Sequence, residues 1–351
     1  MTAGMDRSAF IIGAAAAACI PAAARAQLDT GDAAIRLRFV PDEAQAVLAV
    51  LTRLASGAVP EEPLWTTLFA SEGYRRLAER EHSFGRPFDD ATFRAFVSQP
   101  DVGAKRESLE ATLTAWSHAD VRECGRRALA YLPAASTLRA SVYPEIKPAR
   151  NSFVYDLEHD PGIFLYLEPS IGSTEFTYTV AHELHHVGFA QNCPTAEVRA
   201  QIARLAPPLR LFQRWLGGFG EGFAVLAGAG GPNVDPGTVV GDSARPEWAT
   251  ESATFAARMN DLAAFFHGII SGRLTEGAPA QDVGMTFFGN QGPWYTVGWR
   301  MAVTIERRFG RARLIECIAD NRLFLPAYNA AAAGTPLLRW SDDLAEAFTR
   351  A

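Results

Sequence analysis

The run Ala181-His-Glu-Leu-His-His186 carries the residues of this chain with the clearest chemical potential. On a helix, side chains four residues apart project from the same face, so His182 and His186 can hold one metal ion through their imidazoles. Glu183 lies on the flank of that face, where its carboxylate can accept a proton from a metal-bound water. Zinc lowers the pKa of such a water to about 7, so the spacing indicates zinc-assisted hydrolysis near neutral pH.

A catalytic zinc usually has three protein ligands and one open position, so a third ligand must come from elsewhere in the chain. The segment Gly220-Glu-Gly-Phe-Ala224 places Glu221 at the start of an otherwise apolar helix, and we expect Glu221 to be that ligand. The alternative is an acidic residue that is stabilised only by the dipole at a helix N-terminus. We interpret His185 as a flanking polar residue or a contact of the ligands, and ligation by His182 and His185 stays open.

Two other metal sites share part of this spacing. Glu183-x-x-His186 is half of a di-iron carboxylate motif, which requires a second such pair on a facing helix, and we do not expect one. A metzincin would place a third histidine soon after His186, where the chain instead reads VGFAQNCP. Three alternatives stay open: a motif without metal, a catalytically silent zinc-binding or scaffold protein, and a zinc hydrolase of a non-peptide amide or ester.

The elements that position these residues indicate an α+β fold, mainly helical with a small sheet. Alternating apolar and basic residues predict a strand over 33–40, after which helical patterns dominate to about residue 131. Short runs rich in Val, Phe, Tyr and Leu predict further strands over 138–142, 152–157 and 162–167. The last of these is either an interior strand or an edge on which an extended substrate pairs. A helix over 176–190 follows it directly and carries the metal motif.

Helical segments also fill most of the remaining chain. One begins at Pro194, is interrupted at Pro207-Pro208 and ends near Gly217-Gly-Phe-Gly220. The Gly-, Pro- and Asp-rich stretch over 228–246 predicts a loop, which either covers the cleft or is a plain surface connection. We therefore divide the chain into an N-terminal helical region (27–135), a core with the sheet and metal site (136–230) and a C-terminal helical region (231–351).

The first 26 residues have the pattern of a signal peptide, with a charged start, an apolar stretch and the cleavage site Ala24-Arg-Ala26. We expect export to the periplasm or the extracellular space, with a lipid anchor at Cys19 as the less favoured alternative. No apolar stretch reaches the ~20 residues of a membrane span. Cys124, Cys193 and Cys317 would remain after cleavage, and we expect them to be buried or to form at most one disulfide.

The overall composition is that of an ordinary globular protein. Its 351 residues are 48% hydrophobic and 21% charged, and the formal net charge is −6. Acidic and basic residues are mixed along the chain, so no basic stripe is available to neutralise a phosphate backbone. Nucleic acid is therefore excluded as an expected partner, and nothing in the sequence sets the oligomeric state.

Taken together, His-Glu-Leu-His-His and Gly-Glu-Gly-Phe-Ala resemble the gluzincins, the thermolysin-like clan in which two histidines and a downstream glutamate bind zinc. More narrowly, the chain is similar to uncharacterised bacterial families of zinc-dependent peptidases, which also have a later Tyr-x-x-Gly element, here Tyr295 to Gly298. The resemblance implies a zincin-like fold with an active-site cleft between two lobes. It also implies Zn²⁺ as the cofactor and a peptide or protein as the substrate.

The resemblance further assigns roles to single residues. His182, His186 and Glu221 would be the zinc ligands and Glu183 the catalytic base. Related enzymes often stabilise the oxyanion with a downstream Tyr or His, and we expect Tyr295 in this role. His267 is the second candidate for the oxyanion donor.

The same comparison leaves one position unmatched. Thermolysin has an aspartate four residues after its ligand glutamate, where this chain has Val225. Glu247 and Glu251 are the candidates for the missing carboxylate beside the zinc histidines.

Overall fold

The computed structural model describes residues 33–349. The predicted signal peptide, its cleavage site and Cys19 lie outside these residues, so export and the lipid anchor stay predictions. Within the described residues the chain is mainly helical with one small sheet, as the α+β prediction requires. The division of the chain into three regions also stays a prediction.

The sheet has four strands in the order β1-β2-β4-β3. Their bounds are Ile35–Phe39 (β1), Leu138–Glu145 (β2), Phe153–Tyr155 (β3) and Gly162–Tyr166 (β4). β1, β2 and β4 run parallel, with Ile35 opposite Leu138 and Ser141 opposite Gly162, and β3 runs antiparallel to β4.

β4 therefore lies in the interior of the sheet, and the hypothesis that it forms the substrate-pairing edge is wrong. The physical reason is that β3 folds back and pairs with β4, and Gly162 to Leu165 are all buried, as in a strand covered on both faces. The edge strands are β1 and β3.

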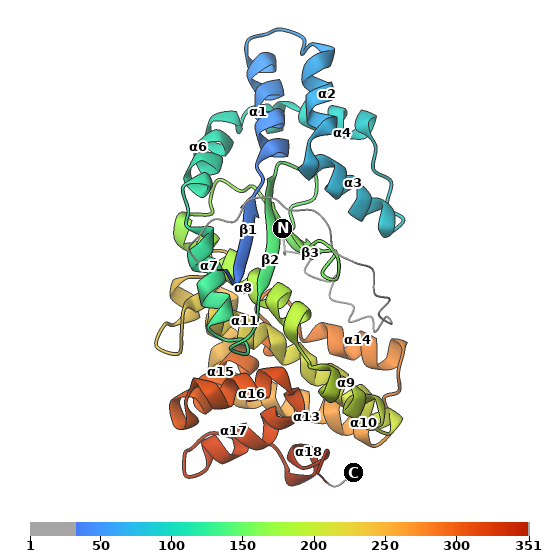
Figure 1. Cartoon of the computed structure of the whole chain (residues 1–351), viewed down its shortest axis with the longest axis vertical. Coiled ribbons are helices and arrows are strands. Elements are labelled where there is room, and N and C mark those ends of the chain that lie inside the picture. Colours follow the sequence, from blue (N-terminus) through green and yellow to red (C-terminus); the bar gives the residue numbers. More distant parts are fainter. Residues whose placement is uncertain (1–32, 350–351) are drawn as a thin grey trace.

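Seven helices of the described chain lie between β1 and β2 in the sequence. They are α1 Asp42–Ala55, α2 Glu62–Ala70, α3 Glu72–Ser83, α4 Asp90–Val97, α5 Pro100–Gly103, α6 Arg106–Ser117 and α7 Val121–Leu129. In the view of Figure 1, α1 to α4 lie above the sheet while α6 and α7 lie beside it. Ser71 and Asp89 cap α3 and α4 by accepting hydrogen bonds from the N–H groups of Tyr74 and Thr92. These helices share one hydrophobic core with the sheet.

A second hydrophobic core holds the C-terminal half together. Aromatic side chains dominate it, and Trp294 meets Phe219 and Phe265 edge-on. The helices are α9 Ala196–Ala203, α10 Pro207–Leu216, α11 Gly220–Ala229, α12 Arg245–Ala253, α13 Phe255–Ile270, α14 Ala278–Thr286, α15 Pro293–Phe309, α16 Arg311–Ala319, α17 Phe324–Ala332 and α18 Asp342–Ala345. The predicted loop over 228–246 overlaps the last residues of α11 and the first of α12. Between Ala229 and Arg245 it contains only the short 3-10 turn Pro236–Thr238.

The long helix α8 (Ser173–Asn192) lies where the two cores meet. Its residues Phe176, Val180 and Leu184 pack into the N-terminal core, and Tyr178 belongs to the C-terminal one. Figure 1 shows α8 and α11 in the middle of the molecule, between the sheet and the C-terminal helices. The metal motif is therefore held at the junction of the two halves.

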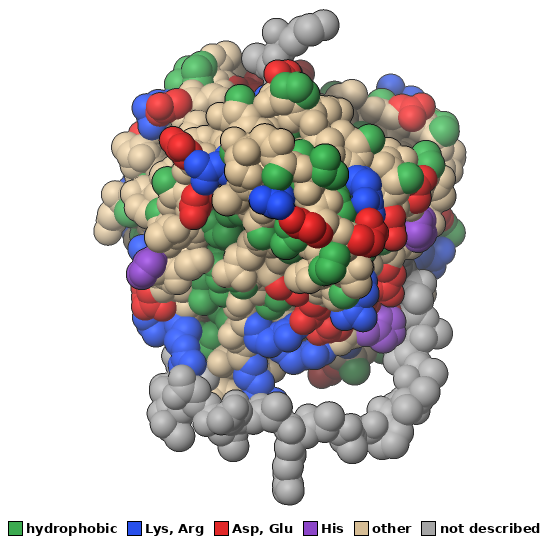
Figure 2. All heavy atoms as spheres, turned by 90° about the horizontal axis from the view of Figure 1, so that it is seen from above, with side chains coloured by type: hydrophobic (Ala, Val, Ile, Leu, Met, Phe, Trp, Pro, Cys, Tyr) green, Lys and Arg blue, Asp and Glu red, His purple; other side chains and the backbone are tan. Residues whose placement is uncertain are grey.

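The surface charges and the cysteines can be compared with what the sequence predicts. The face in Figure 2 carries acidic and basic side chains close together, without a broad patch of one sign. No helix within residues 33–349 is long and apolar enough to cross a membrane. Cys124, Cys193 and Cys317 are buried and free, so none of these three is paired with another.

Candidate metal centre

Three side-chain atoms converge at the centre of the molecule. His182 Nε2 lies 3.1 Å from His186 Nε2 and 3.1 Å from Glu221 Oε2, and the third side of this triangle, from His186 Nε2 to Glu221 Oε2, is 3.2 Å. The three residues are buried, with at most 8% of any one exposed. We call these three residues the donor triangle. They form a group that could hold a metal ion.

The dimensions of the donor triangle suit zinc. Tetrahedral bonds of about 2.0–2.1 Å place two ligand atoms about 3.3–3.4 Å apart. The observed sides of 3.1–3.2 Å therefore need to open by only about 0.2 Å to accept the ion. Two imidazoles and one carboxylate leave a fourth tetrahedral position for water or substrate, as a catalytic site requires.

The charge state of the donor triangle also suits a cation. Burial lowers the pKa of His182, so its imidazole is neutral and can offer a lone pair. Burial raises the pKa of Glu221, but the neighbouring His186 and His182 outweigh this effect and hold that pKa well below its usual range. An ionised carboxylate and a neutral imidazole are the forms that bind zinc.

Glycines bring the helices of the site together. Gly222 follows Glu221 on α11 and lies against the backbone of α15, where a Cβ atom would overlap Gly298 and the amide nitrogen of Trp299. Only a residue without a side chain permits this approach. The Gly-Glu-Gly segment and the Tyr-x-x-Gly element are thus two sides of one helix contact, which fixes Glu221 and Tyr295 relative to each other.

Glu183 lies beside the donor triangle and is not part of it. Its side chain is 5% exposed and makes no hydrogen bond or salt bridge with another residue of the described chain. A nearly buried carboxylate without a protein partner is available to a ligand at the site. This placement is compatible with the general-base role that the spacing predicts.

Tyr295 lies against the first zinc-ligand candidate. Its ring is nearly parallel to that of His182, with an interplanar angle of 14° and 6.1 Å between centroids, and Tyr295 is fully buried. The structure thus brings the predicted donor to the site. His267 instead contacts Asp343 and Ser341 at the C-terminal end of the described chain, and none of its contacts involves the donor triangle.

The candidates for a carboxylate beside the zinc histidines do not reach them. Glu247 accepts the backbone N–H groups of Asn290 and Gln291 at 3.0 and 2.9 Å. Glu251 forms a salt bridge with Arg258. His182 Nδ1 has no hydrogen-bond partner among residues 33–349, which agrees with the apolar Val225 at the position where thermolysin has its aspartate.

His185 lies next to the donor triangle on α8. His185 is buried, its ring centroid lies 6.4 Å from that of His186, and burial lowers its pKa to about 3. It contacts the site without joining the donor triangle.

Glu79 and His82 on α3 repeat the Glu-x-x-His spacing, so our expectation of no second pair is wrong. This pair does not form a metal site in the described chain. His82 Nε2 contacts the carbonyl of Phe88, and neither residue belongs to a group of metal ligands.

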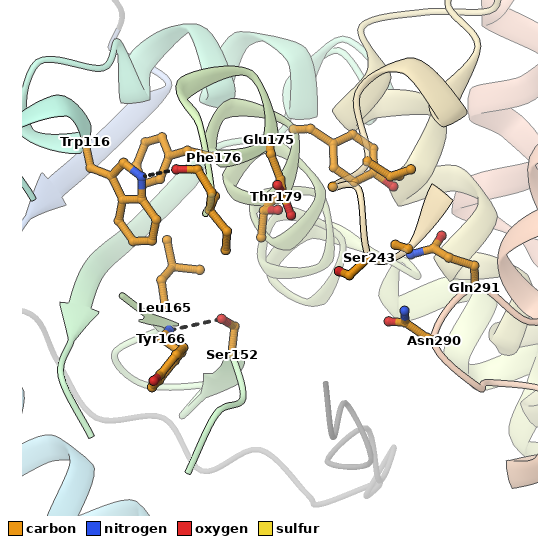
Figure 3. Close-up of a pocket in the computed structure, with 15 residues that line it drawn as sticks. Trp116, Ser152, Leu165, Tyr166, Glu175, Phe176, Thr179, Ser243, Asn290 and Gln291 are labelled. Carbon is orange, nitrogen blue, oxygen red and sulfur yellow. Dashed lines mark hydrogen bonds between the residues drawn. The ribbon is translucent and has the colours of Figure 1, made fainter. Parts of the chain in front are cut away.

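A hollow lies along the first half of α8 (Figure 3), and neither the donor triangle nor Glu183 is among the residues that line it. Tyr178 lines it, and the ring centroid of Tyr178 is 6.0 Å from that of His182. One wall consists mainly of residues from α8 and the sheet. The other consists of Val240, Gly241, Ser243 and Ala244 with the pair Asn290 and Gln291. The predicted loop over 228–246 therefore contributes to the wall of the hollow.

Sequence reasoning missed most of these lining residues. Glu175 and Thr179 could have been found, because they precede Glu183 by eight and four residues and so share its helix face. Asn290 and Gln291 had no such signal, since they come from a distant loop.

Comparison with known proteins agrees with this geometry. Residues 65–335 match the model of the family described as "Putative zinc dependent peptidase (DUF5700)". No curated protein and no solved structure matches the chain. The matched stretch is well over half of the chain and includes the donor triangle, Glu183 and Tyr295. The chain therefore belongs to the DUF5700 family.

Proposed function

We propose that the chain is an active zinc-dependent peptidase of gluzincin type, in which His182, His186 and Glu221 hold the ion. The observation that carries the proposal is the donor triangle, because three buried donors at the edge lengths of a zinc tetrahedron have no comparable structural use. Membership of the family also supports zinc as the metal and a peptide as the substrate.

Zinc, when bound, supplies a Lewis acid that polarises a carbonyl and lowers the pKa of a water. The residues of the chain supply the rest. Glu183 takes a proton at its carboxylate from the attacking water and delivers it to the nitrogen of the leaving amine. Its near-complete burial keeps bulk water from competing for that carboxylate.

In this proposal Tyr295 stabilises the negative charge that develops on the substrate carbonyl oxygen. Peptide hydrolysis passes through a tetrahedral oxyanion, which is stabilised by a preorganised donor. The phenol of Tyr295 is fixed by its burial and by the contact of α15 with α11, and its ring lies against His182. A donor held in this way needs little rearrangement at the moment of reaction.

The substrate lies in the hollow between the two halves in this proposal. The walls come from α8 and the sheet on one side and from the C-terminal half on the other, which supports a cleft between two lobes. Export of the enzyme belongs to the same proposal and rests on the N-terminal sequence pattern alone.

Glu183→Gln tests the proposed mechanism. The amide keeps the size of the side chain and cannot accept the proton, so zinc content should stay at one per chain while turnover falls by about 10² to 10⁴. Turnover is measured on a peptide library and zinc by elemental analysis. Glu197→Gln, the same change on exposed Glu197 of α9, is the control.

Two outcomes would contradict the proposal. Unchanged turnover in the Glu183→Gln variant would remove Glu183 from the mechanism. Stoichiometric zinc in a wild-type protein that cleaves no peptide would favour a silent zinc-binding protein or a hydrolase of other amides or esters.

A further inference from the structure

The hollow beside the donor triangle has a marked asymmetry of charge. Glu175 is the only Asp, Glu, Lys, Arg or His side chain that lines it in the described chain. The remaining lining is aromatic, aliphatic or neutral and polar. Two cations lie over the Tyr166 ring on the sheet side without lining the hollow. Arg150 pairs with Glu168, and Lys147 donates to the backbone carbonyls of Ala149 and Asn151.

The position of Glu175 is set by the opposite wall. Its carboxylate lies against Gly241, and a Cβ atom at that glycine would overlap it. Figure 3 shows Glu175 and Thr179 on the same side of α8, directed toward the space between the walls. The acid is thus directed into the hollow, where it is half-buried.

Gln291 adds a second acceptor. It is 2% exposed, and its Oε1 atom has no hydrogen-bond partner among the described residues. Glu247 holds the backbone of Asn290 and Gln291, which fixes this loop against the hollow. A buried carbonyl oxygen without a hydrogen-bond donor costs free energy, so this atom indicates a ligand that supplies an N–H group.

The aromatic floor suits the apolar stem of a long side chain. Trp116 and Phe176 form part of it and are 2% and 1% exposed, with the Trp116 N–H already committed to the carbonyl of Ile171. The floor therefore offers ring surface and little hydrogen bonding. Lysine and arginine bury their methylene stems on such surfaces while the charged end reaches a polar partner.

We propose that the hollow binds a positively charged group of the substrate peptide, most simply a lysine or arginine side chain, through the Glu175 carboxylate and the Gln291 carbonyl. This inference rests on the proposed peptidase function. Eight residues of α8 separate Glu175 from Glu183, which is about 12 Å of helix. An extended peptide covers that length in about three to four residues, so the basic residue lies a few positions from the scissile bond.

Internally quenched peptides test this inference. A cleaved neutral parent, found with a peptide library, receives lysine or norleucine at each position within four residues of the scissile bond, with the N-terminus free or acetylated. One lysine position should raise kcat/KM about tenfold over norleucine, mainly through KM, since a charge-assisted hydrogen bond is gained there. A preference that disappears on acetylation would instead assign the site to the terminal amine.

Variants of Glu175 give the decisive comparison. Glu175→Gln should remove the lysine preference and leave the norleucine peptide within about twofold of wild type. Glu175→Lys should shift the preference to glutamate at that position. Glu197→Gln on α9 should keep the wild-type preference. Equal cleavage of lysine and norleucine peptides at every position, or an equal loss for both in Glu175→Gln, would overturn the inference and leave the peptidase function intact.

Binding separates this inference from the proposed function. Fluorescence anisotropy with the Glu183→Gln variant measures the affinity for labelled lysine and norleucine peptides without turnover. The lysine peptide should bind about tenfold more tightly, and the added Glu175→Gln change should abolish the difference. If wild type cleaves no peptide, the proposed function fails, and equal affinity for the two peptides in this assay then overturns the inference as well.

Discussion

Replacing Gly222 by alanine should disable the metal centre without touching a ligand. The new Cβ atom would lie 2.5 Å from Gly298 Cα, whereas carbon atoms in contact are about 3.5 Å apart or more. The clash is with backbone atoms of α15, so no side-chain rotation relieves it. α11 and α15 must therefore separate by about 1 Å.

A shift of this size is large for the donor triangle. Glu221 precedes Gly222 directly, and zinc bonds tolerate changes of only about 0.2 Å. We expect the affinity for zinc to fall by about 10- to 100-fold, as when the support of a zinc ligand is removed. The overpacking itself should lower the free energy of unfolding by about 1–3 kcal/mol.

Zinc affinity is measured by competition with a chromophoric chelator, and stability by chemical denaturation of the zinc-free protein. Gly220→Ala is the matched control, because Gly220 lies on the other side of Glu221 and a Cβ atom there meets nothing within 4 Å. Wild-type zinc affinity in Gly222→Ala, or an equal loss in both variants, would refute the role given to the helix contact.

Two further predictions concern single hydroxyl and carboxyl groups. Tyr295→Phe should keep the zinc content and lower kcat by about 10²-fold or more, as expected when an oxyanion donor is lost, and an unchanged kcat would exclude that role. Glu43 is fully buried on α1, accepts the N–H of Ile146 at 3.0 Å, and burial raises its pKa to about 8. The unfolded chain loses this proton near pH 4.5 and the folded chain keeps it, so the contribution of Glu43 to stability is present below pH 4.5 and is lost as pH rises toward 8. Denaturation curves at pH 5 and pH 8 should show Glu43→Gln gaining on wild type by about 3–4 kcal/mol between the two pH values, and a constant difference would contradict this.

The amino-acid sequence by itself determined the parts that depend on local periodicity. The four-residue spacing of His182 and His186 places both rings on one helix face, whatever the rest of the fold does. The short apolar runs before them predicted the strands, and the isolated acid in an apolar helix indicated Glu221. All these signals lie within a single element, where 3.6- or 2-residue repeats relate sequence directly to geometry.

Only the tertiary structure decided which elements meet. Nothing in the run over 162–167 shows that β3 folds back onto β4 and covers its free edge. Glu247 resembled a candidate contact of the zinc histidines, but long-range packing directs it to the loop at Asn290.

The hollow and the helix contact at Gly222 have the same origin. They join segments more than 50 residues apart, and such closures depend on how two hydrophobic cores pack around α8. Local periodicity cannot encode that packing, because the side chains that meet belong to different elements. The zinc-ligand candidates were therefore visible in the sequence, while the shape and charge of the space beside them were set by the fold.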